Sequence, residues 1–271
     1  MRVRYGPWAV VTGASDGIGR EFASRLADAG FDLVLVARRG NVLDQLRAEL
    51  EARAPIRVRS IAADLATNEG VRAVIEGTSQ FDVGLLVAAA GFGTSGRFID
   101  APLEEELGMI DVNCRAVAAL AHHFGKRFAK AGRGGLVFMS SLLAFQGVPR
   151  AANYAATKAY VQSLAEALRL ELSPLGVDVI SSAPGPVQSG FAQRADMKMS
   201  MAGTPASVTQ GTLDALGHTG TVRPGFLSKF LEFSLAFLPR WGRVRMMGLV
   251  MAGMTKHRLL QSAATRSDGA A

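Results

Sequence analysis

The sequence predicts a single doubly wound, Rossmann-like α/β domain, in which a parallel sheet of about seven strands carries helices on both faces. Six short apolar runs alternate with longer helix-like segments, and this alternation is typical of such a sheet. The runs lie at 8–12, 32–36, 57–62, 84–89, 135–139 and 177–182. The 271 residues suffice for one large core, and no repeat or break in composition indicates a second one.

A glycine-rich turn follows the first predicted strand. The run at 8–12 is apolar and β-branched, and a helix-like repeat begins at Arg20 and stops at Gly30. Glycines between a strand and a helix let the backbone come close to a phosphate, and the helix N-terminus supplies N–H donors. The turn therefore predicts a dinucleotide site made of Gly13, Ser15, Asp16, Gly17, Ile18 and Gly19.

The second predicted strand ends in two arginines. Enzymes that use NAD place an acid in this region to bind the adenine ribose, and that acid is missing here. The guanidinium groups of Arg38 and Arg39 suit a 2′-phosphate by charge and by their forked donors, although a solvated basic turn would look the same. We therefore expect NADP(H), with NAD(H) as the alternative.

Tyr154 and Lys158 lie four residues apart in a helix-like segment, which places them on one face, one turn apart. An ammonium close to a phenol favours the phenolate, so we expect Lys158 to lower the pKa of Tyr154. Such a pair can move a proton on or off an alkoxide as a hydride is transferred. Alone, the pair could equally be an ordinary half-exposed helix face.

Several motifs in order give the chain a resemblance to the short-chain dehydrogenases/reductases, from about Val10 to Phe191. The resemblance adds Asn113 and Ser141 to Tyr154 and Lys158 as catalytic residues, with Ser141 thirteen residues before Tyr154. It also implies cofactor contacts at Asp64, Leu65, Ala90, Gly91, Pro184, Gly185, Val187 and Ser189, besides Tyr154 and Lys158. One departure is Ala88-Ala89-Ala90-Gly91, where the family commonly has Asn-Asn-Ala-Gly, and it removes hydrogen bonds that brace the sheet.

The activity implied by the resemblance is interconversion of a ketone, or 3-oxoacyl group, and a secondary alcohol by hydride transfer. The two arginines make NADP(H) the expected cofactor, and the apolar C-terminal third indicates a lipophilic substrate. Tyr154 would act as general acid or base, Lys158 would also hold the nicotinamide ribose, and Ser141 would hydrogen-bond the carbonyl oxygen. Asn113 would hold a water of a proton relay. A non-catalytic NADP-binding sensor or scaffold is the alternative of another class. The resemblance further implies a homodimer or homotetramer.

The C-terminal third contains two apolar runs, 226–238 and 240–251, separated by Pro239. Both are too short to span a membrane. They fit a wall around an apolar substrate, packing in the core or between subunits, or a peripheral membrane contact through 226–258. We assign residues 1–261 to the domain, with 190–258 as substrate lid and apolar extension, including Met197, Met199 and Met201. Residues 262–271 are expected to form a loose tail.

Other features of the sequence exclude several classes of protein. The single cysteine, Cys114, cannot form an intramolecular disulfide and fits a reducing, cytoplasmic compartment. The four histidines form no metal-ligand pattern, so we expect no metal. The net charge is +7, but the basic residues are scattered and aromatics make up only 7%, so we expect no nucleic acid partner.

Overall fold

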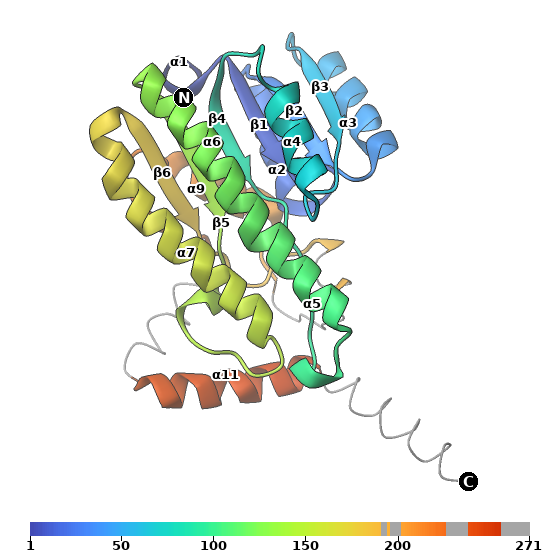
Figure 1. Ribbon diagram of the computed structural model, residues 1–271, viewed down its shortest axis with the longest axis vertical. Coiled ribbons are helices and arrows are strands. Elements are labelled where there is room, and N and C mark those ends of the chain that lie inside the picture. Colours follow the sequence, from blue (N-terminus) through green and yellow to red (C-terminus); the bar gives the residue numbers. More distant parts are fainter. Residues whose placement is uncertain (191–193, 196–201, 226–237, 256–271) are drawn as a thin grey trace.

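The computed structural model describes residues 1–190, 194–195, 202–225 and 238–255. Its centre is a parallel seven-stranded sheet in the order β3-β2-β1-β4-β5-β6-β7 (Figure 1). The strands are β1 (Trp8–Thr12), β2 (Asp32–Ala37), β3 (Val58–Ala62), β4 (Val83–Ala88), β5 (Gly134–Met139), β6 (Val177–Ser182) and β7 (Thr221–Val222). The six strands expected from the sequence are confirmed to within one residue at each end. The seventh has only two residues, which is too short for a sequence pattern.

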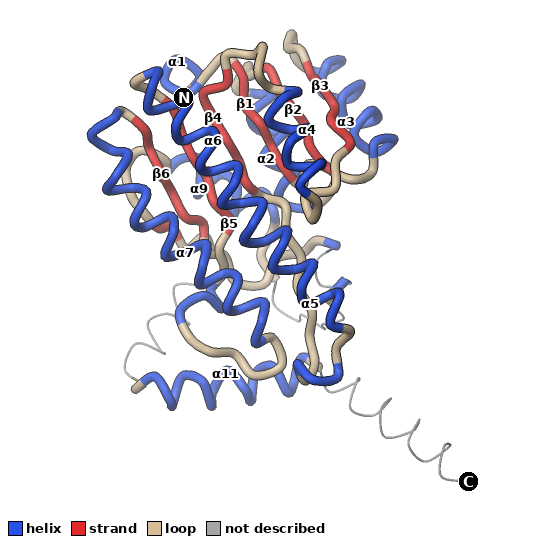
Figure 2. The backbone as a smooth tube through the Cα atoms, in the orientation of Figure 1, coloured by secondary structure: helices blue, strands red, loops and turns tan. Residues whose placement is uncertain are grey.

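Helices cover both faces of the sheet, as Figure 2 shows in blue over the red strands. The longer helices are α2 (Gly17–Asp28), α3 (Gly40–Arg53), α4 (Asn68–Gly77), α5 (Leu103–Ile110), α6 (Ala116–Ala131), α7 (Ala152–Leu172), α9 (Pro205–Ala215) and α11 (Arg240–Met254). Short turns of helix are α1 (Arg2–Tyr5), η1 (Phe98–Asp100), η2 (Asp111–Arg115), η3 (Leu142–Phe145) and η4 (Ser173–Leu175). The predicted doubly wound fold is therefore confirmed.

The alternation of side chains along β1 separates the two layers of the core. Ala9 and Val11 point into the cluster formed with α2, α3 and α9. Trp8 and Val10 point to the opposite face and pack with α4, α6 and α7. Successive side chains of a strand lie on opposite faces, so a strand covered on both sides is apolar throughout, as β1 is.

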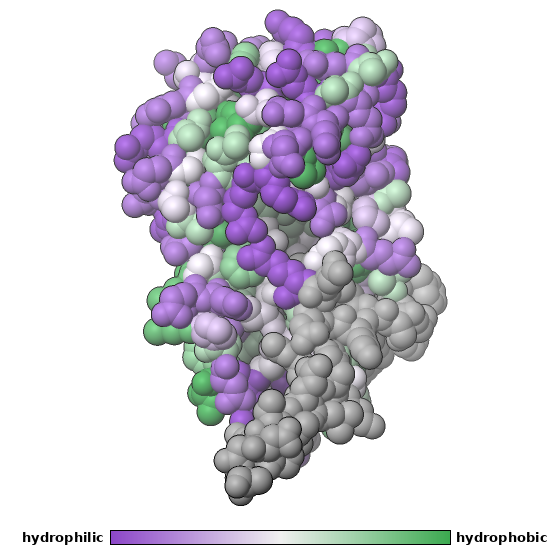
Figure 3. Space-filling model, turned by 90° about the vertical axis from the view of Figure 1, so that its right-hand side faces the viewer, coloured by the Kyte–Doolittle hydropathy of each residue, from purple (hydrophilic) through white to green (hydrophobic). Residues whose placement is uncertain are grey.

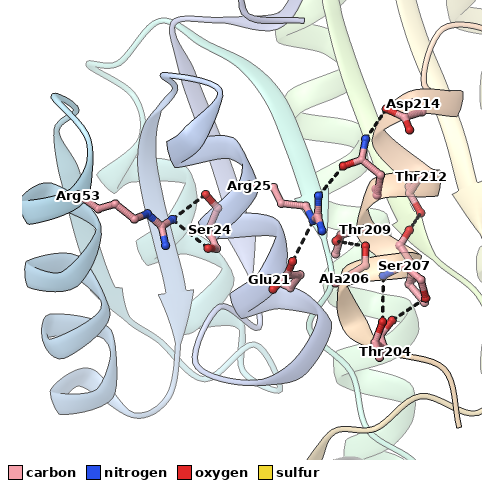
Figure 4. A network of polar contacts seen from close by, with 12 residues as sticks. Glu21, Ser24, Arg25, Arg53, Thr204, Ala206, Ser207, Thr209, Thr212 and Asp214 are labelled. Atoms are coloured by element: carbon pink, nitrogen blue, oxygen red, sulfur yellow. Dashed lines mark hydrogen bonds and ion pairs between the residues drawn. The ribbon is translucent and has the colours of Figure 1, made fainter.

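Polar contacts join the three helices of one layer (Figure 4). The Arg53 guanidinium of α3 donates to the Ser24 hydroxyl of α2 over 2.9 Å. Arg25 of α2 pairs with Glu21 over 2.9 Å and also donates to Gln210 of α9. These exposed contacts are individually weak, so the apolar cluster beneath them holds the layer together.

The sheet order places several loops at one edge. The chain passes from β3 at one end of the sheet back to β4 beside β1, so the strand order reverses between β1 and β4. Loops at the carboxyl ends of parallel strands beside such a reversal form the usual ligand site of this architecture. The residues that follow β1, β4, β5 and β6 are therefore brought together, and they include most of the candidate site residues.

α11 lies apart from the sheet, at the end of the molecule below α5 and α7 in Figure 1. Met247 and Met251 on its inner side belong to a third apolar cluster, which also contains Met109, Val148 and Tyr154. Part of the expected lid is thus described and packs beside the candidate catalytic tyrosine, whereas 191–193, 196–201, 226–237 and the tail 262–271 lie outside the described residues. The lid assignment stays a prediction.

Candidate active site

The turn between β1 and α2 has room only for glycine at two positions. Gly13 has a φ of +69°, and a Cβ there would lie 2.9 Å from the Ala90 nitrogen of the β4 loop. A Cβ at Gly19 would overlap the Gly13 carbonyl oxygen, which puts the start of α2 directly against the turn. The turn therefore keeps its backbone close to the sheet edge and brings the N-terminus of α2 to the same place.

Other residues of the predicted cofactor site gather around this turn. The Asp16 carboxylate accepts from the Gly17 N–H over 2.7 Å and caps α2. Ser189, from the loop after β6, lies so near that a Cβ on Gly17 would be 2.8 Å from its own Cβ. The Arg39 guanidinium donates to the Ser15 hydroxyl over 3.1 Å. The turn, the end of β2 and the loop after β6 therefore meet, as the sequence predicts.

The remaining predicted cofactor residues follow the ends of β3, β4 and β6. Exposed Asp64 accepts from the Ala66 N–H over 3.0 Å, and Leu65 beside it is buried. Pro184 accepts from the Leu142 N–H over 2.9 Å, which holds the β6 loop against the segment after Ser141. Ala90, Gly185 and Val187 lie in these loops, and Ile18 lies in the first turn of α2.

The replacement of the usual asparagines after β4 leaves the sheet edge braced from β1. The Thr12 hydroxyl accepts from the Ala90 N–H over 3.0 Å and donates to the Val87 carbonyl over 3.4 Å. This single side chain joins β1 to β4 and to the loop that follows it. These two hydrogen bonds from β1 thus hold the segment in which the sequence analysis expects hydrogen bonds to be missing.

The four candidate catalytic residues come together from three segments. Asn113 lies in η2, Ser141 follows β5, and Tyr154 and Lys158 stand on α7. The Lys158 ammonium is 5.6 Å from the centre of the Tyr154 ring and donates to the Met139 carbonyl over 2.8 Å. A hydrogen bond joins Tyr154 to Ser141. All four side chains are buried.

Asn113 fixes the loop after β4. Its amide Nδ2 donates to the Phe92 carbonyl over 2.9 Å, and its Oδ1 accepts from the Phe92 N–H over 3.2 Å. The same Nδ2 donates to the Thr157 hydroxyl of α7 over 3.0 Å. Asn113 itself lies in a wider π-type turn over Asp111–Arg115, a local structure often found at functional sites.

Gly91 lies between Asn113 and Lys158. A Cβ at Gly91 would be 2.9 Å from the Asn113 Oδ1 and 3.4 Å from the Lys158 ammonium. The missing side chain therefore leaves room for both the amide and the ammonium against the β4 loop. The role of Gly91 as a cofactor contact stays a prediction.

Burial decides the pKa values of the pair on α7. It raises the pKa of Tyr154 to about 12, and the hydrogen bond from Ser141 offsets only part of this rise. Burial likewise lowers the pKa of Lys158 to about 8, which the nearby Cys114 partly opposes. The pKa of Tyr154 thus moves up, opposite to the lowering that the sequence analysis expects from Lys158, because burial is the largest cause of the shift.

The structure adds residues that the sequence did not indicate. Arg194 stacks on Phe92, with the guanidinium carbon 4.1 Å from the ring centre. Burial and the positive charge of Arg38 lower the pKa of Arg194, so both arginines stand near the same end of the site. Buried Glu106 accepts from the Asn153 amide over 2.7 Å and so ties α5 to the start of α7. No spacing in the sequence connects these residues, since their contacts span distant segments.

Known proteins resemble this chain over most of its length. A family model described as short chain dehydrogenase matches residues 7–200. The 7beta-hydroxysteroid dehydrogenase of Mediterraneibacter gnavus is 28% identical over 242 residues, which cover 84% of this chain and 90% of that protein. The very-long-chain 3-oxoacyl-CoA reductase of Pyrenophora tritici-repentis is 33% identical over 228 residues, or 79% of this chain and 64% of that protein.

A solved structure agrees with these relatives. The short-chain dehydrogenase from Sphingobium yanoikuyae in complex with NADPH has a TM-score of 0.77 and 29% identity, and the match covers 85% of this chain and 93% of that one. Sequence and fold thus point to the same group of oxidoreductases, which interconvert ketones and alcohols. Because the family model matches well over half of the chain, the protein belongs to the short-chain dehydrogenase family.

Proposed function

We propose that the protein is an NADP(H)-dependent carbonyl reductase or alcohol dehydrogenase acting on a lipophilic ketone or 3-oxoacyl group. The observation that carries the proposal is the convergence of Ser141, Tyr154 and Lys158 beside the glycine turn. A general acid, a hydrogen-bond partner and a cation next to a dinucleotide turn form the arrangement that carbonyl reduction needs.

The residues at the turn fit a phosphorylated dinucleotide. Side chains at Gly13 and Gly19 would fill the space against the backbone, and Arg39 lies over Ser15 with Arg38 beside it. Arginine suits a 2′-phosphate through charge and forked donors. A family member of known structure in complex with NADPH supports the same choice of cofactor.

The protein's own side chains would donate the proton and stabilise the charge that forms. When bound, the nicotinamide supplies the hydride to the carbonyl carbon. With a pKa of about 12, Tyr154 is protonated at neutral pH and can give its proton to the carbonyl oxygen, which yields the alcohol. The Ser141 hydroxyl, hydrogen-bonded to Tyr154, would steady the same oxygen. The Lys158 ammonium would stabilise the phenolate left behind until solvent returns a proton.

The surroundings of Tyr154 favour an apolar substrate. Met109, Val148, Met247 and Met251 share a cluster with it, and methionine side chains adapt to irregular apolar shapes. The names of two relatives point the same way, since one acts on a hydroxysteroid and the other on a very-long-chain 3-oxoacyl group. The proposed substrate class is therefore a bulky or long-chain ketone.

The test is loss of NADPH absorbance against ketones graded by size and apolarity. Turnover is expected to rise with apolar bulk, and Tyr154→Phe is expected to lower kcat by roughly 100-fold or more. Tyr160→Phe, the same change at an exposed position of α7, is the matched control and should keep activity. NADPH binding, followed by fluorescence, should stay intact in both variants. Full activity in Tyr154→Phe would refute the assignment.

A further inference from the structure

The outward side of α11 is apolar and exposed. Trp241 and Leu249 are 66% and 72% exposed, and Met246 and Val250 are also exposed. These positions occupy one half of the helix circumference, with Trp241 and Val250 at its two margins, whereas Met247 and Met251 are buried on the other half. A helix that is apolar on both sides normally lies inside a protein, yet α11 lies at one end of the described structure (Figure 1). Its outer side therefore has the exposed apolar side chains that are typical of a surface that binds a partner.

Basic residues accompany this surface. The Arg245 guanidinium is 5.7 Å from the Trp241 ring, and exposed Arg240 begins the helix. From Thr221 to Ala271 the sequence has eight Lys and Arg but only two Asp and Glu, whereas the rest of the chain has twenty-two and twenty-one. Almost all of the net charge of +7 thus belongs to the segment that contains α11.

The positive charge of this segment distinguishes between two partners that could cover an apolar surface, a second copy of the chain and a lipid surface. A second copy of the chain would bring an equally basic segment to the same surface, and like charges would repel. An anionic lipid surface attracts basic residues, while tryptophan and aliphatic side chains enter its headgroup region. Among the described residues, no helix has the length and hydropathy needed to cross a bilayer. The outer side of α11 therefore suits a helix that lies in the interface plane.

We propose that α11 docks the protein on an anionic membrane through Trp241, Met246, Leu249 and Val250, with Arg240 and Arg245 at the headgroups. The inner side of the same helix packs in the cluster of Tyr154, so docking would place the catalytic end of the molecule at the lipid surface. Figure 3 shows hydrophobic residues along the left edge of its lower part and a mainly hydrophilic upper part. A bilayer would supply lipophilic substrates directly at this end.

Tryptophan fluorescence tests the proposal without any substrate. Trp8 is buried and stacked on Phe81 at 4.2 Å, so a change in emission on adding vesicles reports Trp241. With vesicles of phosphatidylcholine and phosphatidylglycerol in a 7:3 ratio, the emission is expected to shift to shorter wavelength, and salt should weaken binding. Pure phosphatidylcholine should give a much smaller shift. The Trp241→Phe variant should give none.

Matched variants locate the contact. Leu249→Glu on α11 is expected to weaken vesicle binding at least about tenfold, because it removes apolar burial and adds a repelled charge. Leu170→Glu, the same change at a 77% exposed leucine of α7, should bind vesicles like the wild type. Arg240→Glu should also weaken binding, and an acid at this helix N-terminus does not harm the fold.

Three results would overturn the proposal. The first is wild-type protein that fails to sediment with anionic vesicles. The second is a Leu249→Glu variant that binds them fully while keeping the wild-type melting temperature. The third is a Leu249→Glu variant that changes from oligomer to monomer in light scattering when the wild type does not bind vesicles, which would assign the surface to a second copy. None of these results bears on ketone reduction, so this proposal and the proposed function can fail separately.

Discussion

The glycine turn and the catalytic helix α7 meet at the same edge of the sheet but depend on different properties of their residues. At the turn, Gly13 and Gly19 matter because they have no side chain, and the backbone itself forms the site. On α7, Tyr154 and Lys158 matter through functional groups whose pKa values are set by burial. A change at the turn should therefore disturb shape and cofactor binding, whereas a change on α7 should disturb proton transfer.

The largest expected effect lies at the turn. In Gly19→Ala, the new methyl group would overlap the Gly13 carbonyl oxygen and force α2 away from the sheet. We expect a loss of about 1–3 kcal/mol in the free energy of unfolding and markedly weaker NADPH binding. Denaturant unfolding with and without NADPH measures both. Gly253→Ala on α11, where a Cβ would meet nothing within 4 Å, should be as stable as the wild type. Equal stability and equal NADPH binding of the two variants would contradict the steric explanation for Gly19.

A substitution at Asn113 tests whether a side chain, like the glycines of the turn, maintains the local structure of the site. Asn113→Leu keeps the volume but leaves the N–H and carbonyl of Phe92 without their amide partner, at a cost of about 1–3 kcal/mol. The free energy of unfolding and kcat should both fall. Thr157→Val removes one hydrogen bond of the same amide and should cost less. If Asn113→Leu proves as stable as the wild type, Asn113 serves catalysis alone.

The arginines beside the turn should affect one cofactor and spare the other. Arg38→Asp replaces a cation near the proposed position of the 2′-phosphate with an anion, so the Kd for NADPH should rise about tenfold or more while that for NADH changes little. Titration of cofactor fluorescence measures both constants. Arg72→Asp, at an exposed arginine of α4, should leave them as they are. An equal loss for the two cofactors would contradict our interpretation of Arg38.

The buried lysine should make stability depend on pH. Lys158 has a pKa of about 8 when folded, against an ordinary value of 10.5, so between these pH values the unfolded chain binds more protons at this group. The stability of the wild type relative to Lys158→Met should therefore rise with pH from 8 to 10, by up to about 1.4 kcal/mol per unit. Lys126→Met, exposed on α6, should show no such trend. A flat difference for Lys158→Met would show that the ammonium is not desolvated.

The smallest effect is expected at Cys114. Burial raises the pKa of its thiol, and the sulfur lies 3.8 Å from the Thr157 carbonyl, so it behaves as a packing residue. Cys114→Ala should change the free energy of unfolding by less than about 1 kcal/mol and leave kcat near the wild-type value. A large fall in kcat with stability unchanged would instead place the thiol in the reaction.

Much of the fold could be predicted because its signals are local. Each strand from β1 to β6 is a continuous apolar run, and the glycine turn and the spacing of Tyr154 and Lys158 lie within single segments. The two-residue β7 could not be predicted, since its pairing with β6 depends on the fold around it. The π-type turn at Asn113 was missed for a similar reason, because the amide of Asn113 is fixed by Phe92 and Thr157 from other segments.

The sequence by itself determined the sheet and the glycine turn, and it indicated which side chains are the catalytic candidates, because strand patterns, turn glycines and helical spacing act over a few residues. Only the tertiary structure decided the pKa values and the neighbours of those side chains. It buried Tyr154 and Lys158 so that their pKa values move apart, brought Arg194 beside Arg38, and set α11 with one side on the catalytic cluster and the other exposed. Desolvation and proximity depend on residues far apart in the chain, and no local pattern contains them.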